Sequence, residues 1–179
     1  MISLIGLPGS GKSTVGKQVA RRLQVPFFDS DHVIEERLGC SIREYFEREG
    51  EDRFRDVESQ VIDELSQRHS GVLSTGGGIV LREVNRQHLR ERTLVVYLNS
   101  SPDELYRRLR HDKNRPLLQV ADPLAKLREL FKQRNALYRE TSRFVIDTGR
   151  PSVATLVNTI MMQLELAGVA PASLNPSKL

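Results

Sequence analysis

One motif near the N-terminus constrains the fold of this chain more than any other feature. Residues 6–13 read Gly-Leu-Pro-Gly-Ser-Gly-Lys-Ser, which matches the phosphate-binding Walker A pattern in full. The apolar run Ile2–Ile5 precedes it, and every fourth residue from Val15 to Leu23 is apolar. That spacing predicts an amphipathic helix over about residues 12–23. The chain is therefore predicted to begin as a strand, a glycine-rich loop and a helix.

The chemistry of such a loop is specific. Glycines allow successive backbone N–H groups to turn toward phosphate oxygens, and the helix N-terminus favours negative charge. Lys12 is expected to reach the β- and γ-phosphates of a nucleotide, and Ser13 to offer its hydroxyl to Mg²⁺. The candidate ATP-binding residues of the loop are Gly9, Ser10, Gly11, Lys12, Ser13 and Thr14.

Strand and helix patterns alternate along the rest of the chain. Strand-like apolar runs stand at residues 2–5, 27–29, 71–75, 93–98 and 144–147. Helices are expected at residues 12–23, from Ser41, at 51–68, from Pro102, at 123–140 and at 151–166. This alternation predicts the α/β class, as a three-layer P-loop NTPase fold with a five-stranded parallel sheet flanked by helices. Ligands are then expected at the carboxyl ends of the strands.

Length and composition favour one soluble domain. The chain has 179 residues, of which 39% are hydrophobic, and no apolar run approaches the ~20 residues of a membrane span. We predict a single domain over residues 1–167, with a mobile polar lid at about 112–121 and a disordered tail at 168–179. Cys40 is the only cysteine and no signal peptide is evident, which favours the cytoplasm.

The basic charge balance admits two interpretations. The net charge is +4, and five Lys or Arg residues lie between Tyr106 and Arg115. Such a run can bind nucleic acid or a small polyanion. No aromatic residues interleave with it as stacking platforms would, so we interpret it as a local phosphate-binding region.

Two acids follow the second predicted strand. Asp29 and Asp31 flank Ser30, and on an extended backbone both carboxylates would face the same side. Phosphoryl transfer to a hydroxyl needs a supported metal and an oriented acceptor oxygen, and two acids could divide these tasks. The alternative is that Asp31 only caps a helix beginning near His32.

Three further features are ambiguous when taken singly. Arg55 and Glu58 share a helix face, as a surface ion pair also would. Arg134 has the character of a solvated helix charge. Gly76–Gly78 follow a strand, where they offer a ligand close access to backbone N–H groups or form a plain flexible turn.

The nucleotide loop alone leaves the fate of the phosphate open. A GTPase would carry a guanine-reading Asn-Lys-x-Asp segment, and none is present. No long apolar run ends in an acid, as in motor ATPases. These observations favour a small kinase.

Taken together, the motifs resemble those of the shikimate kinase family. The resemblance extends to about Leu166 and shows no clear departure at the motif positions. After the loop, the matching segments are Asp29–Asp31, Phe54–Glu58, Gly76–Gly78, Arg115–Leu117 and Arg134–Tyr138.

The resemblance implies a nucleoside-monophosphate-kinase-like fold, the substrates ATP and shikimate, and Mg²⁺ as cofactor. Catalytic roles fall to Lys12, Asp31 and Arg115, and metal binding to Ser13 and Asp29. ATP would also contact Arg108, Arg115 and Arg150, with Arg107 and Arg110 as alternatives to Arg108. The implied shikimate contacts are Asp31, Phe46, Phe54, Arg55, Glu58, Gly76, Gly77, Gly78 and Arg134. Neither nucleic acid nor a membrane is implied, and a monomer is expected.

Three alternatives to this interpretation stay open at the level of sequence. The first is a P-loop kinase with another acceptor, such as gluconate or a nucleoside monophosphate. The second is a nucleotide-dependent nucleic-acid-binding protein, which draws on the pI of about 9.5. The third is a catalytically inactive regulatory domain, against which the intact Lys12, Ser13, Asp29 and Asp31 argue.

Overall fold

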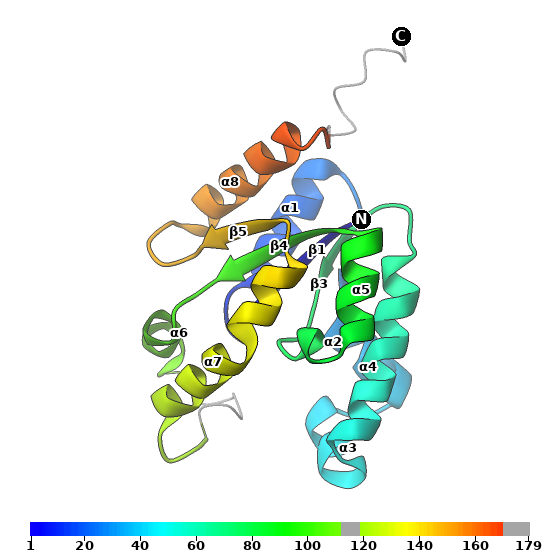
Figure 1. Ribbon diagram of the computed structural model, residues 1–179, viewed down its shortest axis with the longest axis vertical. Coiled ribbons are helices and arrows are strands. Elements are labelled where there is room, and N and C mark those ends of the chain that lie inside the picture. The colour runs from blue at the N-terminus through cyan, green and yellow to red at the C-terminus, as the bar shows by residue number, and fades with distance from the viewer. Residues whose placement is uncertain (112–118, 170–179) are drawn as a thin grey trace.

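A single parallel sheet forms the centre of the molecule. The computed structural model describes residues 1–111 and 119–169 (Figure 1). The five strands are β1 (Ile2–Ile5), β2 (Phe27–Asp29), β3 (Val72–Ser74), β4 (Leu94–Asn99) and β5 (Phe144–Asp147). They lie in the order β2-β3-β1-β4-β5 and every neighbouring pair is parallel, so all five carboxyl ends meet at one edge. The predicted three-layer α/β fold is confirmed.

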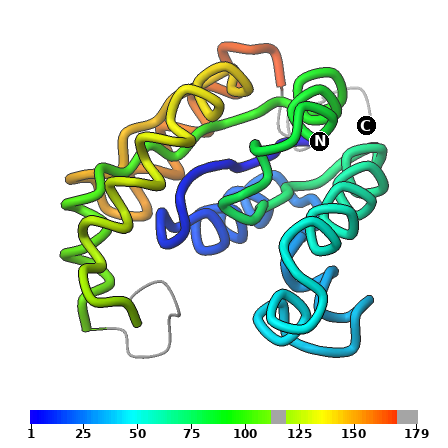
Figure 2. The backbone as a smooth tube through the Cα atoms, turned by 60° about the horizontal axis from the view of Figure 1, so that its bottom comes forward, coloured from blue at the N-terminus to red at the C-terminus, as the bar shows by residue number. Residues whose placement is uncertain are grey.

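Helices cover both faces of this sheet. They are α1 (Lys12–Leu23), α2 (Ser30–Leu38), α3 (Ile42–Glu49), α4 (Glu51–Ser66), α5 (Glu83–Arg92), α6 (Pro102–Leu109), α7 (Pro123–Thr141) and α8 (Val153–Leu166), with a 3-10 turn η1 (Ile79–Leu81). The pair α1 and α8 packs on one face, and α4, α5 and α7 on the other (Figures 1 and 2). This arrangement creates two apolar cores, one on each side of the sheet.

The side chains of β4 show how one strand serves both cores. Val95 and Tyr97 point into the core with α4, α5 and α7, whereas Val96 and Leu98 point into the core with α1 and α8. Each of these four residues is at most 2% exposed. Burying such a side chain contributes about 1.5–3 kcal/mol, so a strand covered on both sides is apolar at every position.

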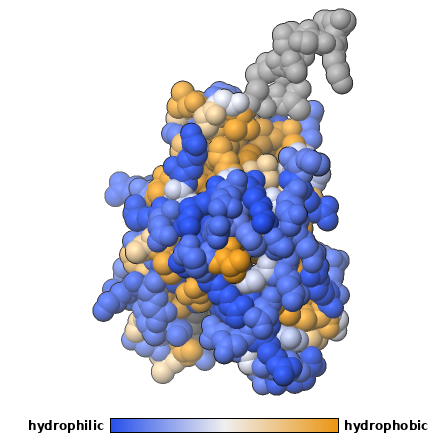
Figure 3. Space-filling model, turned by 45° about the vertical axis from the view of Figure 1, so that its right-hand side comes forward, coloured by the Kyte–Doolittle hydropathy of each residue, from blue (hydrophilic) through white to orange (hydrophobic). Residues whose placement is uncertain are grey.

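Ion pairs tie the outer helices together on the surface. Arg90 pairs with Glu83 on its own helix and with Glu140 on α7, with an N–O distance of 2.9 Å in both cases. The face shown in Figure 3 is mainly hydrophilic, with apolar side chains scattered among charged ones. No helix in the described part of the chain is long and apolar enough to cross a membrane.

Most predicted boundaries are confirmed to within two residues, but α2, expected only as an alternative near His32, begins at Ser30, and two further elements have no predicted counterpart. Helix α4 ends at Ser66 instead of residue 68. Helix α5 and turn η1 were not predicted, because α5 buries only Asn85 and Leu89 and so lacks an apolar period. Of the predicted lid and tail, residues 112–118 and 170–179 lie outside the described residues.

Candidate active site

The phosphate-binding loop joins β1 to α1 at the carboxyl edge of the sheet. Gly9 and Gly11 have φ angles of +82° and +91°, a region that residues with a side chain rarely adopt. A Cβ added to Gly9 would lie 2.5 Å from a methyl carbon of Leu109 on α6. The loop therefore depends on glycine for its backbone shape, and at Gly9 for space as well.

Lys12 lies across this loop. Its ammonium group donates hydrogen bonds of 2.9 Å to the carbonyl oxygens of Gly6 and Leu7. The residue is only 7% exposed. The buried charge is thus held by the carbonyls of the loop, whose amides and helix N-terminus are suited to an incoming phosphate.

Three oxygen-bearing side chains meet beside Lys12. Ser13 donates a 2.7 Å hydrogen bond to a carboxylate oxygen of Asp29, and the Ser74 hydroxyl lies 3.2 Å from that of Ser13. Asp29 and Ser74 are register partners at the ends of β2 and β3. Hydroxyl and carboxylate oxygens are the hard ligands that Mg²⁺ prefers.

The placement of Asp31 corrects one step of the sequence argument. Asp29 and Asp31 do not share one extended segment, since α2 already begins at Ser30. Asp29 is the N-cap residue, and its carboxylate accepts from the backbone N–H groups of Asp31 and His32 at 3.1 and 3.4 Å. The alternative in which Asp31 caps a helix near His32 is wrong as well. Asp31 lies in the first turn of α2, where its side chain is available for another role.

Asp31 stands in an environment that disfavours its ionised form. Burial raises its pKa to about 6, assisted by the negative charges of Asp29 and Glu58, while Lys12 acts in the opposite direction. Gly76 faces this carboxylate so closely that a Cβ there would lie 2.7 Å from an Asp31 oxygen. A buried carboxyl group with a pKa near the operating pH suits a general base.

A buried ion pair lies next to Asp31. Arg55 donates a 2.8 Å hydrogen bond to Glu58 and a 3.3 Å hydrogen bond to Glu51. Glu58 is 1% exposed, and burial raises its pKa although Arg55 and Arg134 act to lower it. The Arg55–Glu58 pair is therefore not the surface ion pair that the sequence left open.

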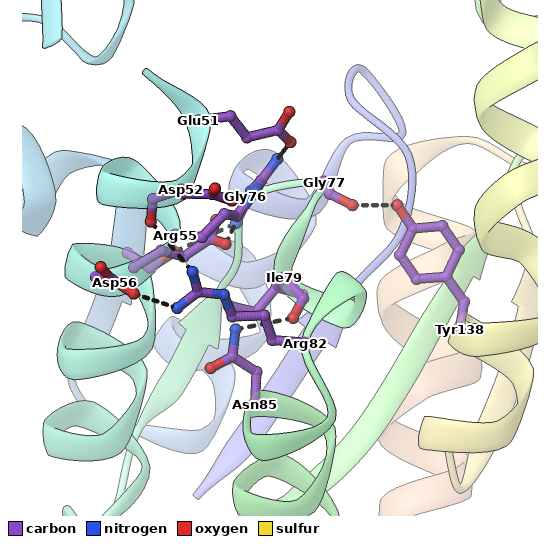
Figure 4. A network of polar contacts seen from close by, with 12 residues as sticks. Glu51, Asp52, Arg55, Asp56, Gly76, Gly77, Ile79, Arg82, Asn85 and Tyr138 are labelled. Atoms are coloured by element: carbon purple, nitrogen blue, oxygen red, sulfur yellow. Dashed lines mark hydrogen bonds and ion pairs between the residues drawn. The ribbon is translucent and has the colours of Figure 1, made fainter. Parts of the chain in front are cut away.

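Each residue of the glycine triplet touches a different part of the site. Gly76 faces Asp31, and Gly78 packs directly on the Arg55 guanidinium. A Cβ on Gly77 would lie 2.6 Å from a ring carbon of Pro8 in the phosphate loop. Figure 4 shows Gly76 and Gly77 between α4 and α7. Because these three residues have no side chains, the phosphate loop, Asp31 and Arg55 can all pack closely against the segment. A side chain at any of the three positions would displace one of these groups.

Two cavities meet at Asp31. The first, of about 690 Å³, is lined by the phosphate loop and by residues around Thr148 and Pro151. The second, of about 680 Å³, lies against α2 and α3 and is lined by Ile42 and Phe46 among others. Asp31 lines both, so it stands at the boundary between the two cavities.

The predicted site residues distribute unevenly over these cavities. The first cavity is lined by Gly9, Ser10, Gly11, Lys12, Ser13, Thr14, Asp29, Asp31, Gly76, Gly77 and Arg108, and the second by Asp31 and Phe46. Phe54, Arg55, Glu58, Gly78 and Arg134 line neither, although Phe54 packs on Phe46 with ring centroids 5.1 Å apart. Their roles as substrate contacts stay predictions, and Arg115 lies outside the described residues.

Among the candidate arginines for the base of the nucleotide, Arg108 lines the first cavity, whereas Arg107, Arg110 and Arg150 do not. Arg108 donates a 2.6 Å hydrogen bond to the Thr148 carbonyl, which ties α6 to the loop after β5. Arg150 is exposed between Gly149 and Pro151, which both line the cavity. The structure thus favours Arg108 over its neighbours.

Sequence analysis missed Ser74 and Thr148. Both are buried polar residues at or just beyond the carboxyl ends of β3 and β5. A polar residue at that end of a buried parallel strand is a recognisable signal. The signal that points to Asp29 at the end of β2 points equally to these two residues.

Fold and site together define a class. A parallel sheet of this order, a phosphate loop before α1 and an acidic residue between two adjoining cavities are the features of a P-loop kinase for a small acceptor. Comparisons with known proteins narrow the class further. The family model for shikimate kinase matches residues 8–165.

Relatives and solved structures agree with that match. The shikimate kinase of Paracidovorax citrulli is 61% identical over 175 residues, covering 96% of each chain. That of Ralstonia nicotianae is 57% identical, covering 98% of this chain and 94% of the relative. A solved shikimate kinase from Acinetobacter baumannii in complex with shikimate superimposes with a TM-score of 0.87 at 44% identity, covering 93% of both chains. The chain belongs to the shikimate kinase family.

Proposed function

We propose that this enzyme transfers the γ-phosphoryl group of ATP to the 3-hydroxyl of shikimate, giving shikimate 3-phosphate and ADP in aromatic amino-acid biosynthesis. The observation that carries the proposal is the position of Asp31, which lines both the phosphate-loop cavity and its neighbour. A group at that junction can contact an acceptor hydroxyl and face the phosphate that the hydroxyl attacks.

Asp31 serves as the base and orienter in this reaction. Its carboxylate accepts the proton of the acceptor hydroxyl as the oxygen bonds to the γ-phosphorus and the bond to the β-phosphate oxygen breaks. A pKa of about 6 leaves Asp31 mostly ionised at neutral pH, yet more basic than an exposed aspartate. That balance suits proton transfer near pH 7.

Charge that develops on the transferred group is stabilised from the nucleotide side. Lys12 and the loop amides lie where phosphate oxygens would bind, and Lys12 exchanges its carbonyl contacts for them. Arg115 has the same proposed role on the strength of the family resemblance.

Ser13 and Asp29 fit a Mg²⁺ site at the phosphates, because their oxygens already lie 2.7 Å apart beside the loop. Mg²⁺ held by Ser13 and Asp29 would supply positive charge that offsets the negative charge of the phosphates. Within residues 1–111 and 119–169, no three His, Cys, Asp or Glu side chains form a metal cluster.

The carboxylate of shikimate is assigned to Arg55 and Arg134. Glu58 accepts a hydrogen bond from Arg55, and its negative charge stabilises the positive charge of Arg55. This contact keeps the guanidinium oriented. Guanidinium groups bind carboxylates through paired hydrogen bonds. The apolar wall formed by Phe46 and Phe54 supports the ring side of the same substrate.

The wider setting follows from the same chemistry. Residues 1–167 act as one catalytic domain, and a monomer suffices because one chain supplies every assigned group. ATP as substrate and Cys40 as a free thiol are typical of the cytoplasm.

The test is the release of ADP from Mg-ATP with shikimate, gluconate, AMP or no acceptor in parallel. Stimulation by shikimate alone supports the proposal. Turnover with gluconate or AMP but not with shikimate would retain a P-loop kinase and reject the assignment of Arg55 and Arg134 to the carboxylate of shikimate.

A further inference from the structure

Side chains from three helices hold the glycine segment and the turn η1 that follows it, and the first is Ser30 on α2, whose hydroxyl accepts a 3.2 Å hydrogen bond from the Gly76 N–H. Asn85 on α5 donates a 3.1 Å hydrogen bond to the Ile79 carbonyl, and Arg86 donates one of 2.7 Å to the Val80 carbonyl. From the opposite side, the Tyr138 hydroxyl on α7 donates to the Gly77 carbonyl. Figure 4 shows the Asn85 and Tyr138 contacts on either side of the segment.

A glycine run needs such external contacts because its backbone has more freedom than that of any other residue. Gly77 packs on Pro8 of the phosphate loop and Gly78 on Arg55. A displacement of Gly77 would therefore change the spacing between the phosphate loop and the arginine assigned to the acceptor. The contact that fixes Gly77 is the one from Tyr138.

Tyr138 is built as a rigid donor. The residue is fully buried, and its ring stacks on that of Tyr97 with centroids 4.9 Å apart and 28° between the planes. Burial raises the pKa of its hydroxyl, and Arg134 opposes that rise through its charge and through hydrogen bonding. The hydroxyl donates to Gly77, and it feels the charge of Arg134, which lies one helical turn earlier on α7.

We propose that Tyr138 is a positioning residue for acceptor binding. By donating to Gly77 it fixes the glycine triplet against the phosphate loop and Arg55, and it keeps Arg134 in register with that triplet. This role rests on the proposed function, because it is measured through shikimate.

The chain supplies its own control for a purely structural role. Tyr97 is also fully buried and belongs to the same ring pair. Its hydroxyl lies 3.0 Å from side-chain oxygens of Asn99 and Asn135, and not on the glycine segment. Tyr97→Phe and Tyr138→Phe each remove one hydroxyl from the same stack, so general loss of core stability affects both.

The experiment compares the steady-state kinetics and thermal midpoints of the wild type, Tyr138→Phe and Tyr97→Phe. We expect Tyr138→Phe to raise the KM for shikimate about three- to tenfold, the range of one lost hydrogen bond, with the KM for ATP within about twofold. Tyr97→Phe should leave the ratio of the two KM values unchanged, even if its thermal midpoint falls as much as that of Tyr138→Phe.

Two other outcomes are separable. If both variants change the KM ratio equally, or if neither changes it, Tyr138 is only a core aromatic residue and the inference is wrong. If the wild type itself shows no turnover of shikimate, the proposed function fails first, before either variant is compared.

Discussion

The nucleotide side and the acceptor side of this site are built in opposite ways. The nucleotide side is mostly one continuous segment, residues 6–13, which is proposed to bind phosphate through its backbone conformation and the N-terminus of α1. The acceptor side gathers Asp31 from α2, the Arg55–Glu58 pair from α4, the glycine triplet after β3 and Arg134 from α7. The first depends on local backbone shape and the second on tertiary packing.

This difference predicts how substitutions will affect each side. Changes on the nucleotide side should act through the conformation of a few neighbouring residues. The effect of a substitution on the acceptor side should extend to several other groups of the site, because Glu58 influences Asp31 as well as Arg55. The following variants are designed to break or sharpen that contrast.

The largest effect is expected at the junction of the two sides. Asp31→Asn keeps the shape of the side chain but removes the base, so kcat should fall about 10²- to 10⁴-fold. ATP binding should change little, since the phosphate loop is untouched. Steady-state kinetics and ATP titration measure the two quantities separately. A variant with near-normal kcat would show that Asp31 is not the base.

The second test removes one partner from the buried pair. Glu58→Gln leaves the Arg55 charge, whose side chain is 11% exposed, without its closest partner. Breaking a buried pair in this way costs about 3–5 kcal/mol, and the remaining contact to Glu51 should keep the loss of unfolding free energy near about 3 kcal/mol. Denaturant unfolding measures that loss, and the KM for shikimate should rise with it.

Glu51→Gln is the matched control for Glu58→Gln. Glu51 contacts the same guanidinium at 3.3 Å, but its side chain is 58% exposed. An exposed pair contributes at most about 1 kcal/mol, so this variant should resemble the wild type. Equal losses in the two variants would mean that burial does not distinguish these contacts.

Sequence alone predicted the two sides to different degrees. The phosphate loop could be predicted from sequence, because the residues that define it, such as Gly11 and Lys12, are adjacent in the chain. On the acceptor side, neither the cap at Asp29 nor the burial of Glu58 follows from local pattern, since both depend on what packs against them. There the family resemblance pointed to the segments, and the structure corrected how Asp29 and Asp31 are arranged.

The fold was predictable for a related reason. Strands such as β4 are covered on both faces and therefore stand out as apolar runs. Helix α5 did not stand out, because most of its residues are charged or polar and it docks mainly through Leu89, Asn85 and ion pairs to α7 and α4. Elements held by specific polar contacts leave no periodic signal in the sequence.

The third test asks whether the function of Asp31 opposes stability. Its pKa is higher in the folded state, about 6, than the ordinary value of 3.8. The protonated form is thus favoured by folding, so this contribution to stability is present below pH 3.8 and is lost as the pH rises through about 6. The ionised form is correspondingly unfavourable at pH 8.

Asp31→Asn should therefore be more stable than the wild type at pH 8, by about 2 kcal/mol, since the shift corresponds to at most about 3 kcal/mol at about 1.4 kcal/mol per unit. The advantage should shrink at pH 5, where Asp31 is mostly protonated in the folded wild type. Urea unfolding at both pH values measures it. An advantage that is the same at pH 5 and pH 8 would contradict the elevated pKa.

The last and smallest effects compare one glycine from each side. Gly9→Ala places a side chain at φ +82° and against Leu109, which should distort the loop and raise the KM for ATP about tenfold. Gly78 has φ −89°, so Gly78→Ala meets no backbone strain and acts only by displacing the Arg55 guanidinium. It should raise the KM for shikimate by a similar factor.

The control for this pair is Gly39→Ala. Gly39 has φ +67° but nothing within 4 Å of the added Cβ, and it ends α2 and lines neither cavity. It therefore reproduces the backbone strain of Gly9→Ala, about 1–2 kcal/mol of stability, without a change in either KM. If Gly9→Ala raises only the KM for ATP and Gly78→Ala only the KM for shikimate, the two sides are functionally separate. If both KM values rise together in both variants, the contact between Gly77 and Pro8 already couples the two sides into one unit.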